Sequence, residues 1–279
     1  MKPWADFVLR TGAAFLVALA LSPAIGLLCP KTPFHRVMTR TFQVALVVSL
    51  AVRRGPVREW PAKLRAMGFR GPYRRARVLL GASVGVAAMA LVLLVSWLLG
   101  GRGPAPPHRL GLLTHLLVAL GTGVAVGLFE EIFFRGYLKV ALGGVASAAV
   151  YAVVHFLAPI GKTEPAGASF DPLLAVKRLN ELNAITDPQR ALMGIPCLLV
   201  FGLALNRLRE RTDTLYLGMG LHAGAVFVLA FYGRFLSLKS TDPWIFGGAF
   251  ARDGLLPLLA LLLLLLASYR APLPPWARA

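Results

Sequence analysis

Two adjacent glutamates lie in an apolar run that begins near Leu110 and contains the sequence G-L-F-E-E-I-F-F-R-G at residues 127–136. An ionised carboxylate in hydrocarbon costs from about 3 to more than 10 kcal/mol, so a chain that carries Glu130 and Glu131 there is expected to use at least one of them. Arg135 follows Glu131 by four residues, which on a helix places both side chains on one face in the favourable acid-first order. We therefore expect Glu131 to pair with Arg135 and Glu130 to be available for chemistry.

Two later apolar runs each carry a histidine. His155 lies in S-A-A-V-Y-A-V-V-H-F-L, one helical turn after Tyr151, and His222 lies in L-G-M-G-L-H-A-G-A-V-F-V among small residues. A single histidine in such a run is more often a hydrogen-bonded packing residue. Three runs that each carry an ionisable group favour a shared site, because polar groups inside a membrane need partners.

A glutamate and a histidine around one water molecule form a workable general base. A second histidine could donate a hydrogen bond to a developing oxyanion. Together these groups suit hydrolysis of a peptide bond without a covalent intermediate. The zinc motif H-E-x-x-H is absent from the sequence, and we do not expect a serine mechanism.

The sequence E-E-I-F-F-R-G resembles the E-E-x-x-x-R-G signature of the CAAX-protease and bacteriocin-processing family of intramembrane endopeptidases. Tyr151 to His155 is similar to that family's aromatic-x-x-x-His motif, with tyrosine where phenylalanine is usual. His222 stands where an H-x-x-x-N or H-x-x-x-D motif begins, but Val226 occupies its last position. The resemblance covers residues 110–230.

The resemblance implies a role for each polar residue. Glu130 and His155 would activate water, His222 would donate to the oxyanion, and Glu131 with Arg135 would support them. Glu130, His155 and His222 would also suit zinc as a three-ligand set with an open fourth position. We favour a metal-free, cofactor-free site, with zinc as the alternative.

One element of the family pattern lacks a matching side chain. The asparagine that would complete the oxyanion hole is replaced by Val226. Asn206, on an earlier apolar run, is the candidate substitute.

Composition sets the fold class. The 279 residues are 57% hydrophobic and 15% charged, with a mean hydropathy of +0.68, which indicates a polytopic membrane protein. We predict an all-α transmembrane bundle that forms a single membrane domain over 1–279, with the active site inside the bundle and the catalytic core at 110–233. About eight spans are expected: 7–28, 36–52, 78–99, 110–136, 141–159, 191–207, 214–233 and 255–269.

The net charge of +18 would also fit a nucleic-acid-binding protein, but the basic residues are interspersed with the spans. We therefore expect contact with anionic lipids at the basic loops and no nucleic acid. Segment 53–77 carries nine Lys and Arg against one acid, which predicts a cytoplasmic segment on the membrane surface and both termini in the cytoplasm. With this orientation, segment 161–190 is predicted to be a long extracytoplasmic loop. The composition suits a bacterial inner membrane protein.

Three functions remain open from the sequence. The favoured one is an intramembrane endopeptidase that cuts a membrane-tethered protein or peptide. The second is a catalytically inactive relative that acts as a binding, immunity or scaffold module, which the valine at position 226 favours. The third is a proton-coupled transporter, for which only His115 extends the set of ionisable groups towards the outer side.

Overall fold

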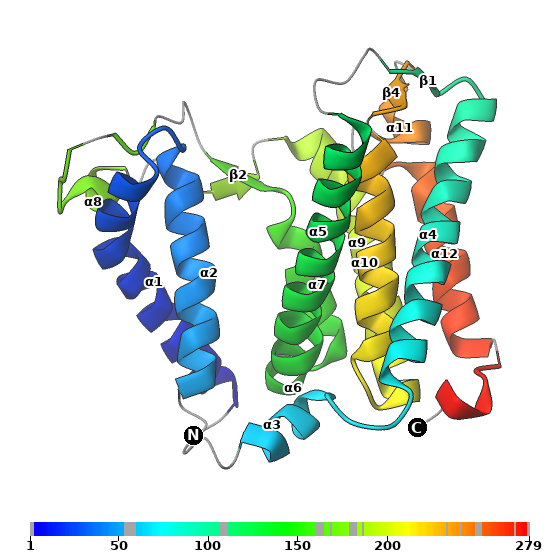
Figure 1. Cartoon of the computed structure of the whole chain (residues 1–279), viewed down its shortest axis with the longest axis horizontal. Coiled ribbons are helices and arrows are strands. Elements are labelled where there is room, and N and C mark those ends of the chain that lie inside the picture. The colour runs from blue at the N-terminus through cyan, green and yellow to red at the C-terminus, as the bar shows by residue number, and fades with distance from the viewer. Residues whose placement is uncertain are drawn as a thin grey trace. The chain divides into compact units, whose positions relative to one another are not determined.

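The residues that the structure describes are mostly helical, as the sequence predicts, and the strands among them form two short two-stranded sheets (Figure 1). The computed structural model describes residues 3–52, 60–105, 111–159, 165–167, 169–178, 183–185, 187–232, 234–239, 242–248, 253–270 and 272–277. They form two compact units, one made of residues 1–63 and 156–188 and the other of residues 64–155 and 189–279. The single membrane domain over 1–279 stays a prediction.

The first unit is built on a helical hairpin. Helices α1 (Pro3–Leu28) and α2 (Phe34–Val52) pack along each other, and α8 (Leu174–Lys177) contacts α1. Strands β2 (Leu157–Pro159) and β3 (Asn183–Ile185) pair in antiparallel fashion. The unit's core gathers apolar side chains from all three helices and from the segment before α8: Ala18, Phe34, Val37, Met38, Ala166 and Ala175. The boundary between the two units in the chain, after Lys63, falls within helix α3 (Trp60–Met67).

The second unit is a bundle around α10. Its main helices are α4 (Arg74–Leu98), α5 (Leu112–Glu130), α7 (Gly144–Val154), α9 (Pro188–Thr212), α10 (Tyr216–Tyr232) and α12 (Leu255–Arg270). Helix α10 packs most extensively on α4 and α5 and lies between them (Figure 1). At one end of the bundle, β1 (Arg102–Pro104) pairs with β4 (Leu236–Leu238), followed by α11 (Pro243–Phe246). A short 3₁₀ turn, η4 (Pro275–Ala277), follows α12.

Glycines bring the central helices into backbone contact. A Cβ atom at Gly123 or Gly127 of α5 would lie 2.6–2.8 Å from a carbonyl oxygen of α10. On the other side of α10 the helices approach more closely still, and glycines of α4 and α10 face carbonyl groups of the opposite helix: Gly81, Gly85, Gly220 and Gly224. Small residues of this kind let membrane helices approach closely, since van der Waals packing drives helix association in lipid.

Four helical stretches among the described residues are long and apolar enough to cross a membrane: Ala5–Leu28, Arg74–Leu98, Leu112–Leu142 and Pro188–Thr212. Helices α7, α10 and α12 are apolar but shorter, and α2, which carries Arg36 and Arg40, does not reach that hydropathy. Each of the eight predicted spans therefore corresponds to a helix of the structure, although not all have spanning length.

The predicted span 141–159 differs most from the structure. Gly143 adopts φ 87°, a conformation that glycine tolerates because it has no Cβ atom, and it ends the preceding helix. Helix α7 then runs for only 11 residues and ends at Val154, so the predicted bounds of this span are wrong. Because α7 ends at Val154, His155 lies at a helix end rather than in the middle of a span.

Parts of two predicted segments lie outside the described residues. In the basic segment 53–77, residues 53–59 are outside; the rest contains α3 and the start of α4. In the loop 161–190, residues 161–164, 168, 179–182 and 186 are outside; α8 and β3 form part of the remainder. The surface location of the first segment and the extracytoplasmic location of the second stay predictions.

The close contact at Gly127 gives a stability prediction. A methyl group in Gly127→Ala would meet the Met219 carbonyl oxygen at 2.8 Å and the Ala223 side chain at 2.9 Å, so we expect a loss of about 1–3 kcal/mol in the free energy of unfolding. Gly121→Ala on the same helix is the control, because nothing lies within 4 Å of its added Cβ. Denaturant unfolding in detergent measures both. Equal stability of the two variants would show that the α5–α10 contact is not tight.

Candidate active site

The helix that carries the two glutamates changes its winding at the site. Helix α5 ends at Glu130, and the π-helix η2 (Glu131–Leu138) continues it into α6 (Lys139–Leu142). A π-helix is rare and is often found at functional sites. The Ser147 hydroxyl on α7 donates to the Phe134 carbonyl at 2.7 Å, which ties α7 to the widened turn.

Glu131 and Arg135 form the ion pair that their spacing suggests. Arg135 Nη1 lies 3.0 Å from Glu131 Oε1, with the side chains 0% and 1% exposed. The ring of His222, on α10, donates from Nδ1 to the same carboxylate oxygen at 3.0 Å. A buried ion pair holds only when further hydrogen bonds compensate for the water it has lost, and His222 supplies one. Glu131 therefore joins η2 to α10.

The hydrogen bond to Glu131 fixes the orientation of His222. With Nδ1–H directed at the carboxylate, Nε2 points into the space on the other side of the ring. There Nε2 lies 3.7 Å from Glu130 Oε2 and 3.4 Å from the Tyr151 hydroxyl. Phe201 of α9 packs edge-on against the ring, with centroids 5.3 Å apart.

His155 is oriented by the end of its own helix. The last carbonyl groups of a helix have no partner within the helix. His155 follows α7 directly, and its Nδ1–H donates to one of these, the Tyr151 carbonyl, at 2.7 Å. Its Nε2 consequently faces away from the helix, 3.5 Å from Glu130 Oε2. In the neutral ring this Nε2 carries a lone pair.

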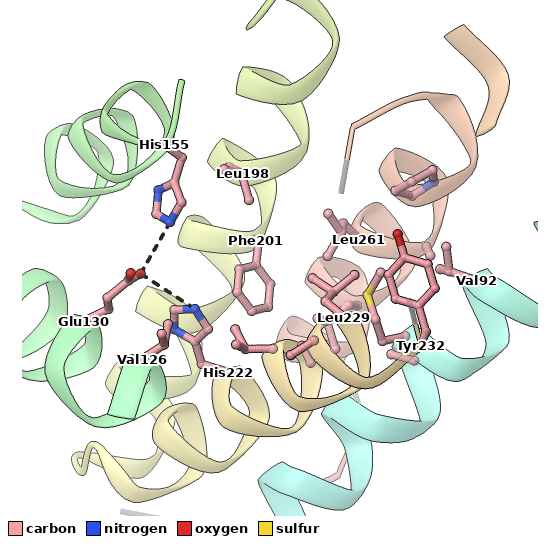
Figure 2. Close-up of a pocket in the computed structure, with 18 of the residues that line it drawn as sticks. Val92, Val126, Glu130, His155, Leu198, Phe201, His222, Leu229, Tyr232 and Leu261 are labelled. Atoms are coloured by element: carbon pink, nitrogen blue, oxygen red, sulfur yellow. Dashed lines mark ion pairs between the residues drawn. The ribbon is translucent and has the colours of Figure 1, made fainter. Parts of the chain in front are cut away.

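One carboxylate oxygen thus faces two imidazole nitrogens. Glu130 Oε2 lies between the Nε2 atoms of His155 and His222, at distances slightly longer than an ordinary hydrogen bond (Figure 2). The Glu130 side chain is 27% exposed, whereas that of Glu131 is 1% exposed. The Glu130 side chain is therefore partly accessible, and that of Glu131 is enclosed.

These groups stand at one end of an apolar cavity of about 590 Å³. Figure 2 shows Glu130, His155 and His222 on one side and Leu229, Tyr232 and Leu261 on the other. The wall between them is almost wholly hydrophobic and comes from α4, α5, α9, α10 and α12. Its members include Met89, Val92, Val126, Leu198, Val226, Leu229 and Leu264.

A comparison with protein families bears on this arrangement. Residues 112–228 match the family model described as type II CAAX prenyl endopeptidase Rce1-like, and the match contains Glu130, His155 and His222. The segment 112–228, fewer than half of the 279 residues, is therefore similar to the CAAX protease family. The chain matches no curated protein and no solved structure. This similarity and the apolar helices together support an integral membrane protein.

The donor groups of the site bear on whether a metal ion could bind there. Among the described residues, no group of three or more His, Cys, Asp or Glu side chains has an arrangement that could hold a metal ion. Glu130, His155 and His222 have donor types that zinc accepts, but they do not meet that geometry together. No step proposed below passes through a metal.

Other residues singled out by the sequence lie elsewhere. Asn206 donates from Nδ2 to the Gly144 carbonyl at 2.6 Å and is not among the residues that line the cavity, so it does not substitute at the oxyanion position. Val226 does line the cavity. His115 stacks on the ring of Phe231, and its Nε2 lies 3.2 Å from the Phe231 carbonyl oxygen. His115 is therefore a hydrogen-bonded packing residue.

The chain also contains one G-x-S-x-G sequence, at residues 81–85, of the type that can mark a serine nucleophile. That motif needs a sharp strand-to-helix turn to present its serine. Here it lies inside α4, where Gly81 and Gly85 face α10 and Ser83 is exposed on another face. The glycines serve helix packing, and Ser83 is absent from the cavity.

The Tyr151 hydroxyl and the π-helix are parts of the site that the sequence did not indicate. A tyrosine at position 151 signals only an aromatic side chain one turn before His155. Its contact with His222 depends on how α7 lies against α10.

The buried ion pair gives a second stability prediction. Glu131→Leu leaves the Arg135 guanidinium buried without its carboxylate, which should cost about 3–5 kcal/mol in the free energy of unfolding. The double variant Glu131→Leu with Arg135→Leu removes both charges and should be more stable than the single variant. Denaturant unfolding in detergent compares the two. A double variant less stable than Glu131→Leu would contradict the view that the isolated charge causes the loss.

Proposed function

We propose that the chain is an intramembrane endopeptidase that hydrolyses a peptide bond of a membrane-tethered protein or peptide, with water activated by Glu130 and His155. The observation that carries this proposal is the single carboxylate oxygen of Glu130 that faces two imidazole Nε2 atoms at the polar end of an apolar cavity. The similarity of residues 112–228 to a family of prenyl endopeptidases supports it independently.

The first step is attack by water. A water molecule beside Glu130 Oε2 and His155 Nε2 donates a hydrogen bond to each, since His155 presents its lone pair there. Glu130 takes one proton as the water oxygen bonds to the carbonyl carbon of the substrate. The product of this step is a tetrahedral intermediate with a negative oxygen.

The second step is collapse of this intermediate. In our proposal His222 acts with both ring nitrogens protonated: Nδ1–H is held by Glu131, and Nε2–H donates to the negative oxygen. The proton on Glu130 passes to the amide nitrogen, the C–N bond breaks, and the carbonyl re-forms. The products are the carboxylic acid and the amine, and Glu130 returns to its ionised form. No covalent intermediate with the protein is needed.

The cavity suggests the kind of substrate. Its apolar wall would hold a hydrocarbon group in water-free surroundings while the peptide bond lies at the glutamate and the histidines. A peptide tethered by an isoprenoid chain fits this requirement, in keeping with the name of the matched family. An apolar segment of a peptide precursor would fit it as well.

One observation favours a second function. Val226 brings an aliphatic side chain to the cavity beside His222, where the family pattern has an amide or a carboxylate. A non-catalytic member that binds a membrane-tethered partner in the same cavity is therefore the alternative.

We further propose a bacterial inner membrane location, with both termini in the cytoplasm and anionic lipids at the basic segments. The nine basic residues in 53–77 support this orientation. A fluorescent protein that matures only in the cytoplasm should be fluorescent when fused to the C-terminus. A dark fusion, with an externally active reporter functional at the same place, would reverse the orientation.

The catalytic assignment predicts the behaviour of three variants. With an isoprenylated peptide in detergent micelles, Glu130→Gln and His155→Phe should each lower kcat by about 10²–10⁴, because each loses a partner of the attacking water. Glu210→Gln is the matched control: this glutamate is 49% exposed and pairs with Lys139 and Arg207 away from the cavity. Its cleavage rate should equal that of the wild type.

The same assay with a zinc chelator tests the metal. Activity unaffected by the chelator would agree with the mechanism above, whereas loss that added zinc restores would make the three site residues ligands. Retention of wild-type kcat in both Glu130→Gln and His155→Phe would overturn the catalytic assignment. Binding of the peptide without cleavage by any form of the protein would favour the alternative function.

A further inference from the structure

The surroundings of Tyr151 hold its ring rigidly at the reacting end of the cavity. The residue is 1% exposed, lines the cavity, and packs edge-on against Phe134 and His155 with centroid distances of 5.0 and 4.6 Å. The Arg135 guanidinium lies over the same ring, 4.4 Å from its centroid. A side chain enclosed in this way points its hydroxyl in one direction.

That direction is towards His222. Tyr151 Oη lies 3.4 Å from His222 Nε2, and this Nε2 lies 3.7 Å from Glu130 Oε2. The hydroxyl and Nε2 therefore border the same space beside the carboxylate. A carbonyl group attacked by water held at Glu130 would place its oxygen within reach of both.

A tetrahedral oxyanion is best stabilised by preorganised donors directed at it, commonly more than one. Among the described lining residues, two hydroxyl side chains besides Tyr151 face the cavity. Thr122 already donates to the Val118 carbonyl at 2.7 Å. Tyr232 accepts from Arg102 Nη1 at 3.4 Å and lies on the side of the cavity opposite Glu130 (Figure 2). Val226, one turn after His222, has no polar atom in its side chain.

We propose that the Tyr151 hydroxyl is a catalytic hydrogen-bond donor that completes the oxyanion hole with His222 Nε2–H. This inference rests on the proposed hydrolysis. The hydroxyl keeps its proton throughout: it donates a hydrogen bond to the carbonyl oxygen as negative charge develops and releases it when the intermediate collapses.

The ion pair beneath the site supports both donors. Glu131 holds the His222 ring by Nδ1, and Arg135, held by Glu131, lies over the Tyr151 ring. A cation over an aromatic ring is attracted to its π face, which fixes the ring in place.

The test is removal of the hydroxyl alone. Tyr151→Phe keeps the ring contacts and should lower kcat about 10²–10³-fold with KM within about two-fold of wild type, as expected for a donor that acts in the transition state. Tyr216→Phe is the control, since Tyr216 is a buried tyrosine of α10 that does not line the cavity. Its kcat should be unchanged.

A rescue variant separates donation from structure. Val226 lies on the cavity wall four residues after His222, so Val226→Asn presents an amide N–H₂ group on the same helix face. Added to Tyr151→Phe, it should raise kcat at least about ten-fold over the single variant, because a replacement donor meets the oxyanion. A merely structural defect would not respond.

A binding measurement keeps the inference testable without turnover. An isoprenylated peptidyl phosphonate carries a tetrahedral anionic group in place of the scissile carbonyl. Its affinity should fall about 10²–10³-fold in Tyr151→Phe, while that of the corresponding uncleavable amine isostere stays the same. Equal phosphonate affinity in the two proteins would overturn the inference.

The outcomes also separate this inference from the proposed function. Cleavage by the wild type, lost in Glu130→Gln but kept in Tyr151→Phe, would overturn the role of Tyr151 and leave the hydrolysis intact. Failure of the wild type to cleave or to prefer the phosphonate would overturn both.

Discussion

The carboxylate of Glu131 is the constraint on which the site depends. A charge enclosed in a membrane-embedded bundle must be neutralised and hydrogen-bonded, and Arg135 and His222 both contact the same oxygen of Glu131. Because Arg135 belongs to the same helix and His222 to α10, the carboxylate fixes the relative position of η2 and α10. The direction of His222 Nε2, and hence its position beside Glu130, follows from this contact.

The glycines of the bundle make that contact reachable. Gly127 and Gly123 allow α5 to lie against the backbone of α10, and Gly218 faces the Glu131 carboxylate, where a Cβ atom would come within 3.1 Å of Oε2. With larger side chains at these positions α10 would stand further away, and Glu131 would lose His222. The apolar residues of the same helices then form the cavity wall, so packing and substrate space come from one set of elements.

The sequence predicted the parts of this account that local chemistry decides. The helical membrane class follows from apolar runs, and the Glu131–Arg135 pair follows from the spacing of four residues. The convergence of Glu130, His155 and His222 could be expected because polar groups in lipid need one another. The family resemblance rests on the motif around Glu130 and agrees with the match over residues 112–228.

Other features depend on tertiary contacts that no local pattern contains. The span 141–159 looked continuous in hydropathy, yet a positive φ at Gly143 ends one helix, and His155 becomes the residue that caps the next. Asn206 has the right chemistry at a similar depth, but its amide is used by the Gly144 carbonyl. The winding of η2 and the approach of the Tyr151 hydroxyl to His222 arise from how α7 packs on its neighbours.

The central claim is that Glu130 and His155 act together on one water molecule, and a double-mutant cycle in kcat/KM tests it most directly. The cycle compares Glu130→Ala, His155→Ala and the combination on one isoprenylated peptide. The account predicts strong coupling: the double variant should be about as slow as the slower single variant, because either change already removes the positioned water. Losses that multiply would mean that the two residues act independently, and would contradict the account.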